Sequence, residues 1–107
     1  MARWAVSLVL VLVTNPSVAE PPDAERQADL LNLLRHDCGS CHGLTMKGGL
    51  GPSLEPASLE GKADEALVAI ILDGIPGTPM PPWRPELNDT EAAWMVDQLR
   101  RGLEGPP

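Results

Sequence analysis

The sequence has little positive charge. Eight lysines and arginines stand against fifteen aspartates and glutamates, which gives a formal net charge of −7. Nucleic-acid-binding surfaces need basic patches that neutralise phosphates, so this balance argues against a nucleic-acid partner. An acidic surface is compatible with electrostatic steering toward a protein that presents a positive patch, or with a charge that only keeps a small protein soluble.

Cysteine is also scarce, since Cys38 and Cys41 are the only two. A disulfide between them would close a very short loop and would constrain the unfolded chain very little. His42 follows them directly, and Cys38-Gly39-Ser40-Cys41-His42 matches the pattern C-x-x-C-H. This pattern predicts covalent attachment of one c-type haem by the two thiols, with His42 as the proximal iron ligand. A haem-free dithiol protein is the alternative, but the thioredoxin type expects a βαβ pattern beside its cysteines, and none is visible.

The chain lacks an apolar run long enough to cross a bilayer, which takes about 20 residues. Its N-terminus combines a basic start, an apolar stretch over residues 4–13, a break at Thr14-Asn15-Pro16 and the small-x-small sequence Ser17-Val18-Ala19. This order is typical of a secretory signal peptide. We therefore expect residues 1–19 to be removed and residues 20–107 to form one domain in the periplasm, without stable membrane insertion. An uncleaved membrane anchor is the alternative.

Valine and isoleucine are concentrated in the N-terminal stretch and in one later segment, so a β-sheet has little to be built from. Residues 24–35 contain no Gly, Pro or β-branched residue and repeat leucine at helical spacing, which predicts an amphipathic helix that runs into the C-x-x-C-H pattern. Residues 62–73 are apolar almost all round and predict a largely buried helix that stops at Gly74.

A last helix is predicted over residues 88–103, with Asn88 as N-cap and Glu91 in the capping-box position. Irregular chain is expected over residues 48–61 and 74–86, because glycine and proline interrupt both segments. The domain therefore reads as all-α with long loops.

The loop over residues 74–86 holds five prolines and two glycines, too many for a regular element. Met80 lies in it between two prolines, and such a stiff backbone can hold a thioether at the iron with little loss of conformational entropy. The other methionines are less suited, because they fall in the signal peptide, too near the C-x-x-C-H pattern, or among the apolar residues of the last helix: Met1, Met46 and Met95. We predict Met80 as the sixth iron ligand; the alternative is a methionine that only fills a gap in the loop.

The order of C-x-x-C-H, Gly51-Pro52, a second helix, Met80 in a proline-rich loop and a capped last helix resembles the small class I cytochromes c. The resemblance covers essentially all of residues 20–107. It implies three or four helices wrapped around one covalently attached haem. It also implies that the Pro52 carbonyl accepts a hydrogen bond from the proximal imidazole, which would orient that ligand; a plain loop Gly-Pro is the alternative.

The chain departs from many relatives in the contact between its first and last helices. Leu30 and Leu34 stand where those relatives place a glycine and an aromatic residue, and Gln98 stands where they place a tyrosine. We therefore expect this helix contact to be repacked, with the haem ligands unaffected.

Residues 77–83 and the acidic last helix resemble a narrower group, the periplasmic cytochromes of the c55X type, which are associated with dissimilatory nitrite reductase in denitrifying bacteria. The resemblance implies electron delivery to that reductase, or a role in maturing its d-type haem. With His42 and Met80 both on the iron, no position remains for a substrate, so we expect a one-electron carrier and not an enzyme. If Met80 does not ligate, a five-coordinate gas-binding or peroxidatic haem protein is the alternative.

Trp83 and Arg84 follow Met80 closely in the same loop. Trp83 is a candidate for lining the haem edge or donating its N–H to a propionate, and Arg84 for pairing with that charge. Core packing for Trp83 and a solvated surface position for Arg84 are the alternatives.

Overall fold

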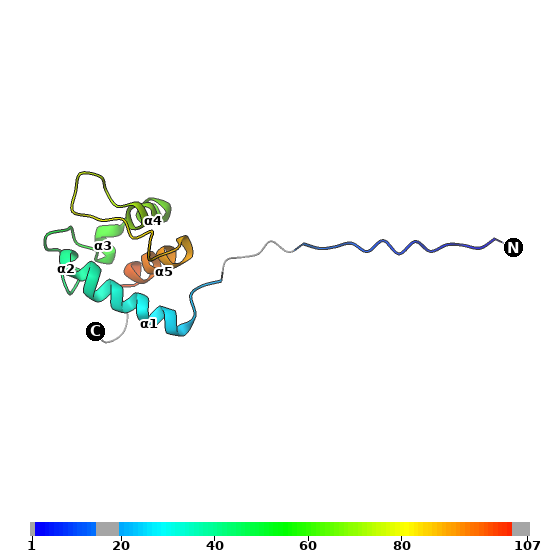
Figure 1. Ribbon diagram of the computed structural model, residues 1–107, viewed down its shortest axis with the longest axis horizontal. Helices are drawn as coiled ribbons and strands as arrows, with labels where there is room; N and C mark the ends of the chain where they lie inside the picture. Colours follow the sequence, from blue (N-terminus) through cyan, green and yellow to red (C-terminus); the bar gives the residue numbers. More distant parts are fainter. Residues whose placement is uncertain (1, 15–19, 104–107) are drawn as a thin grey trace.

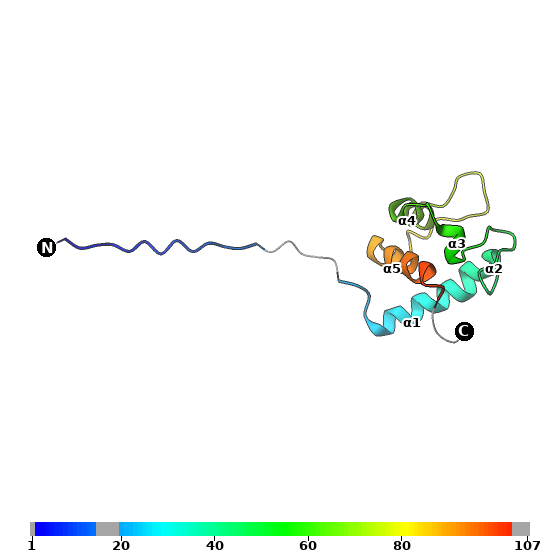
Figure 2. The same ribbon diagram turned by 180° about the vertical axis from the view of Figure 1, so that it is seen from behind.

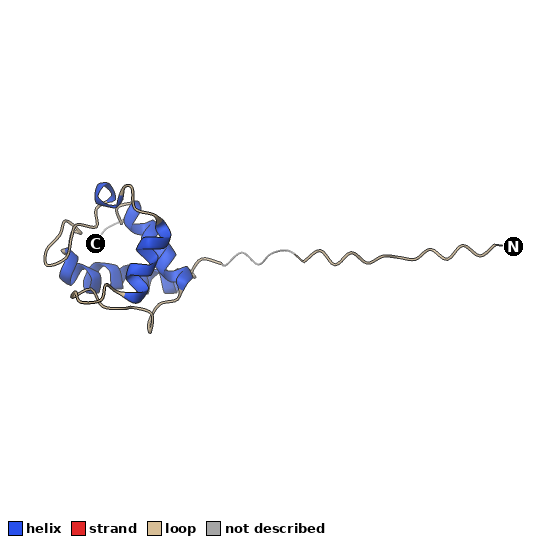
Figure 3. Cartoon of the chain, turned by 90° about the horizontal axis from the view of Figure 1, so that it is seen from above, coloured by secondary structure: helices blue, strands red, loops and turns tan. Residues whose placement is uncertain are grey.

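The computed structural model describes residues 2–14 and 20–103, while residues 1, 15–19 and 104–107 lie outside the described part. The described chain is helical and contains no strand (Figure 3). In chain order, its helical segments are α1 (Ala24–Leu33), η1 (Leu34–Cys38), α2 (Gly39–His42), α3 (Pro56–Leu59), α4 (Asp64–Asp73) and α5 (Asp89–Arg100) (Figure 1). The prediction of an all-α fold is confirmed.

The N-terminal stretch stands apart from the helices. Residues 2–14 form no helix and are exposed throughout, and both side views show them leading away from the helical part (Figures 1 and 2). The apolar stretch of the expected signal peptide falls here, whereas its cleavage site at residues 17–19 lies outside the described residues. Among the described residues, no helix has both the length and the apolar character needed to cross a membrane.

The first helix forms where the sequence predicts it and continues to His42 through η1 and α2. Asp23 caps its start by accepting a hydrogen bond from the Arg26 backbone N–H at 2.8 Å. Leu30 and Leu34 are fully buried on its inner side. The five-residue π-helical segment η1, which the sequence did not predict, ends at Cys38, the first cysteine of C-x-x-C-H. Gly43 ends the run with φ of +91°, a conformation that favours glycine.

The second predicted helix is α4, which begins at Asp64 and stops at Gly74 with φ of +66°. The stop at Gly74 is confirmed, but the expectation of a largely buried helix is wrong. Leu72 is its only buried residue, while Ala66 and Ala69 are exposed. The physical reason is that α4 packs against α5 on one side, so its opposite side lies at the surface of a small domain.

A short helix, α3, occupies part of the segment that we expected to be irregular. It spans Pro56–Leu59, begins with proline in its first turn and buries Leu59 in the core. Proline suits the first turn because its missing N–H would have no helical partner there. A single turn is too short to produce a hydrophobic period, which is why the sequence pattern missed it.

The capping box at the start of α5 is confirmed. The Asn88 side chain accepts from the Glu91 N–H at 2.8 Å, and the Glu91 carboxylate accepts from the Asn88 N–H at 3.0 Å. The helix ends at Arg100, earlier than expected, because Gly102 and Leu103 adopt positive φ. The largest fully buried side chains of the described domain come from several helices: Leu30, Leu34, Leu59, Leu72, Met95 and Val96.

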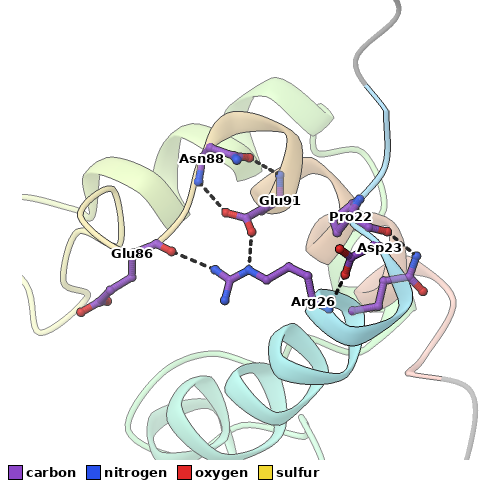
Figure 4. A network of polar contacts seen from close by, with 7 residues as sticks. Pro22, Asp23, Arg26, Glu86, Asn88 and Glu91 are labelled. Atoms are coloured by element: carbon purple, nitrogen blue, oxygen red, sulfur yellow. Dashed lines mark hydrogen bonds and ion pairs between the residues drawn. The ribbon is translucent and has the colours of Figure 1, made fainter.

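A polar network joins the N-terminal ends of α1 and α5 (Figure 4). The Arg26 guanidinium donates to the Glu91 carboxylate and also to the Glu86 carbonyl, the latter at 3.1 Å. Because the same carboxylate closes the capping box, one arginine ties the start of the first helix to the start of the last. The hydrogen bond from Arg26 holds the pKa of Glu91 below its usual range.

Candidate haem site

The C-x-x-C-H segment is held by a loop that folds back onto it. The Gly48 N–H donates to the His42 carbonyl at 2.8 Å, and the Gly51 N–H donates to the Cys41 carbonyl at 2.7 Å. These bonds bring the backbone of Gly51 against the His42 ring, where an added Cβ would lie 2.9 Å from Nδ1. Glycine at this position therefore lets the loop lie close to the imidazole.

His42 and Pro52 are in direct contact. The imidazole Nδ1 lies 2.7 Å from the Pro52 carbonyl oxygen. A carbonyl can only accept, so Nδ1 carries the proton and the lone pair of the neutral ring sits on Nε2. This arrangement fixes both the tautomer and the direction of the ring, which prepares Nε2 to bind a metal.

No disulfide joins Cys38 and Cys41, and both residues are half-buried. Burial raises the pKa of the Cys38 thiol to about 11, and the neighbouring charge of Asp37 adds to the effect. A redox-active C-x-x-C pair needs the opposite, a thiol whose pKa is lowered so that the thiolate is present at neutral pH. The environment of Cys38 therefore disfavours the dithiol alternative.

Met80 lies on a closed loop at the end of α4. The Ile75 N–H donates to the Met80 carbonyl at 3.2 Å, and the Thr78 hydroxyl accepts from the Met80 N–H at 3.3 Å. Gly74 begins the loop, and a Cβ there would lie 2.6 Å from the Met80 carbonyl oxygen. Short-range contacts thus fix the backbone of Met80, and Met80 is half-buried.

In both side views the methionine loop, over residues 74–83, and α2 lie toward the end of the domain far from the N-terminal stretch (Figures 1 and 2). The structure brings His42 and Pro52 together directly, and it places Met80 on the separate loop that follows α4.

Trp83, the last residue of the methionine loop, and Arg84, which follows it, both contact other parts of the described chain. Trp83 is half-buried and packs against the hydrophobic core. The Arg84 guanidinium donates to both carboxylate oxygens of Asp73, at 2.8 and 3.0 Å. Sequence reasoning missed this pair, because nothing in the sequence marks Asp73 at the end of α4 as lying beside a residue on the far side of the loop.

The chemistry of these residues fits haem c. Two thiols suit thioether bonds, an imidazole with its lone pair on Nε2 suits the iron, and a methionine thioether is a soft second ligand. The sequence predicted these groups but not the structural roles of Gly51 and Gly74. The backbone of Gly51 lies close to His42 and that of Gly74 close to Met80, and these contacts exist only in the folded loops.

Comparison with known proteins places the chain in a class. A family model described as cytochrome c oxidase, cbb3-type, subunit III matches residues 25–98. The all-α fold and the C-x-x-C-H helix agree with that match and define a c-type cytochrome, whose cofactor is covalently attached haem c.

More specific relatives share most of the chain's length. Cytochrome c55X of Paracoccus denitrificans is 54% identical over 99 residues, which are 92% of this chain and 94% of the relative. Cytochrome c55X of Pseudomonas aeruginosa is 50% identical over 106 residues, 98% of this chain and 89% of the relative. The solved structure of the c-type cytochrome NirC superimposes with a TM-score of 0.76 at 56% identity, covering 79% of this chain and 100% of NirC. The chain belongs to the cytochrome c55X family, within the broader family of the matching model.

A larger protein contains a segment similar to this domain. Dihydro-heme d1 dehydrogenase of Pseudomonas aeruginosa is 36% identical over 75 residues, which are 70% of this chain but only 15% of that protein. The solved structure of dihydro-heme d1 dehydrogenase NirN gives a TM-score of 0.60 at 36% identity, covering 71% of this chain and 16% of NirN.

Proposed function

We propose that Cys38 and Cys41 bind the haem through thioether bonds and that His42 and Met80 are the two axial ligands of its iron. The observation that carries this proposal is the 2.7 Å contact between Nδ1 of His42 and the Pro52 carbonyl. It engages one ring nitrogen and directs the lone pair of the other toward a metal. Pro52 then acts as the residue that orients the proximal ligand.

Ligation by Met80 makes the protein an electron carrier rather than an enzyme. Histidine and methionine together fill both axial positions, so a substrate has no open site on the iron, and this ligand pair raises the reduction potential. The hydrogen-bonded loop around Met80 supports the assignment, because a thioether on a fixed backbone loses little entropy on binding. Trp83 contributes at the haem edge through its position beside the core.

The carrier works in the periplasm and passes electrons to dissimilatory nitrite reductase during denitrification. Its membership of the cytochrome c55X family supports this role, since the group is associated with that reductase. Residues 1–19 act as a signal peptide; the basic start, the short apolar stretch over residues 4–13 and the small-x-small sequence at residues 17–19 support this. Docking is weak and transient, as is usual for small redox interfaces.

The experiment is to mix the reduced protein with the nitrite reductase of the same organism and to follow oxidation of the haem when nitrite is added. We expect rapid oxidation whose rate falls as ionic strength rises, because the acidic surface steers the encounter. Absence of oxidation would contradict the carrier role. The mass of the exported protein tests the leader, since it should lack residues 1–19 and include one haem.

A second candidate is a part in maturing the d-type haem of nitrite reductase. The similarity to a segment of dihydro-heme d1 dehydrogenase favours it. Deleting the gene separates the two roles. A reductase that lacks its d-type haem would support maturation, whereas a reductase with full d-type haem but slow reduction would support the carrier.

A further inference from the structure

One arginine joins the two ends of the methionine loop. Arg84 follows the loop, and its guanidinium binds both carboxylate oxygens of Asp73, the last residue of α4, at 2.8 and 3.0 Å. The third nitrogen of the same group, Nη1, lies 3.7 Å from the Asp89 carboxylate at the start of α5. The ion pair between Arg84 and Asp73 therefore joins the two ends of the loop, where the chain leaves α4 and where it returns.

The backbone pairs at the same place. The N–H groups of Trp83 and Arg84 donate to the carbonyls of Ile71 and Leu72, each at 3.0 Å. These bonds dock the returning chain on the last turn of α4, and the Arg84 side chain reinforces them from outside. The hydrogen bonds from Arg84 also hold the pKa of Asp73 below its usual value, so the pair is charged at neutral pH.

We propose that Arg84 is a positioning residue for Met80: by clamping the base of the loop to Asp73, it keeps the thioether on the iron. This inference rests on the proposed ligation by Met80. The methionine can leave the iron only if its loop moves, and an external ligand can bind only to the state in which it has left. A contact that stabilises the closed loop therefore weakens the apparent affinity of any competing ligand.

The test uses imidazole as the competing ligand. The ferric holoprotein is titrated with imidazole while the absorption band of the methionine–iron bond is followed. Arg84→Gln should bind imidazole about two- to fivefold more tightly than the wild type, which is the range that an exposed ion pair can supply. Asp73→Asn should give the same increase, and the double variant should add nothing to either single change.

Salt gives an independent arm. Ions screen an exposed pair, so rising ionic strength should move the wild type toward the affinity of Arg84→Gln and leave that variant nearly unchanged. Arg101→Gln is the matched control, because it removes an exposed arginine–carboxylate contact of 2.9 Å to Asp97 at the C-terminal end of α5, the end opposite to Asp89. We expect this control to bind imidazole as the wild type does.

Three outcomes would overturn the inference. Equal effects of Arg84→Gln and Arg101→Gln would show that the clamp does not act on the loop. An effect of Arg84→Gln without one of Asp73→Asn would assign Arg84 to another partner, such as a haem propionate. A wild type with no methionine–iron band would overturn both this inference and the ligation by Met80, whereas either of the first two outcomes, with the band present in the wild type, would overturn the inference alone.

Discussion

Two consecutive residues hold the imidazole of His42, since its Nδ1 lies 2.7 Å from the Pro52 carbonyl and its ring lies against the backbone of Gly51. The loop that carries both residues is fixed by backbone hydrogen bonds to the end of α2. The folded loop thus sets the orientation of the His42 ring.

Gly51→Ala tests this orientation. An added Cβ would lie 2.9 Å from Nδ1, closer than a carbon can approach, so the ring must turn or the loop must shift. Weakening the bond to Pro52 makes the imidazole a poorer electron donor to the iron, and we expect the reduction potential to rise. Redox titration measures it.

Gly39→Ala is the matched control for that variant. It also adds a methyl group beside the haem-binding segment, but the new Cβ would make only ordinary contacts of 3.5 Å or more. An equal shift of the potential in both variants would contradict the explanation.

Gly74→Ala tests how the methionine loop is seated. Gly74 has φ of +66°, and an added Cβ would lie 2.6 Å from the Met80 carbonyl oxygen. The substitution must move the loop, so we expect a weaker methionine–iron band in the ferric spectrum.

Gly77→Ala isolates the contact from the backbone strain. Gly77 lies in the same loop with φ of +79°, but a Cβ there meets nothing within 4 Å. Both substitutions place a residue with a side chain at positive φ, which costs on the order of 1–3 kcal/mol. Only Gly74→Ala should diminish the band, and a comparable loss in Gly77→Ala would show that strain alone explains the effect.

The bond between Arg26 and Glu91 should make stability depend on pH. The pKa of Glu91 is lowered from its ordinary value of 4.5, mainly by the hydrogen bond from Arg26. A carboxylate whose pKa is lowered in the folded protein stabilises it fully when the pH is above the pKa in the unfolded chain. This stabilisation is lost as the pH falls below 4.5 and through the lower pKa of Glu91 in the folded protein. Glu91→Gln should therefore lower the free energy of unfolding at neutral pH, and this difference should shrink in acid.

We expect the loss at neutral pH to be about 1 kcal/mol, because Arg26 is 38% exposed and solvent screens the pair. Urea unfolding at neutral and acid pH measures it. Glu65→Gln is the control, since Glu65 lies exposed on α4 and makes no ion pair among the described residues. A difference that stays constant with pH would contradict the role of the Glu91 charge.

Short-range patterns in the sequence predicted much of the fold. The first helix follows from a run without Gly, Pro or β-branched residues, and the start of α5 follows from Asn88 and Glu91, whose side chains act on neighbours three residues away. These features are short-range, so the sequence displays them directly. The single turn of α3 and the π-helical segment η1 are too short to show a hydrophobic periodicity in the sequence, and tertiary packing decides whether they form.

The site divides in the same way. The haem-binding pattern and the prolines around Met80 are formed by neighbouring residues, so the sequence shows them directly. The ion pair of Arg84 with Asp73 and the close approach of Gly74 to Met80 form only when the loop folds. The sequence did not predict that one side of α4 is exposed. An apolar helix sequence does not show how many other elements of a small domain will pack against that helix.

The most direct test of the account is the optical spectrum of Met80→Leu beside that of the wild type. We predict that the ferric wild type shows a methionine–iron band, that Met80→Leu loses it, and that the ferrous variant binds carbon monoxide rapidly. Met46→Leu, a change of similar volume at a buried position, should keep the band. A Met80→Leu protein that retains the band, or a wild type that never shows it, would contradict ligation by Met80 and with it the reading of this cytochrome as a six-coordinate electron carrier.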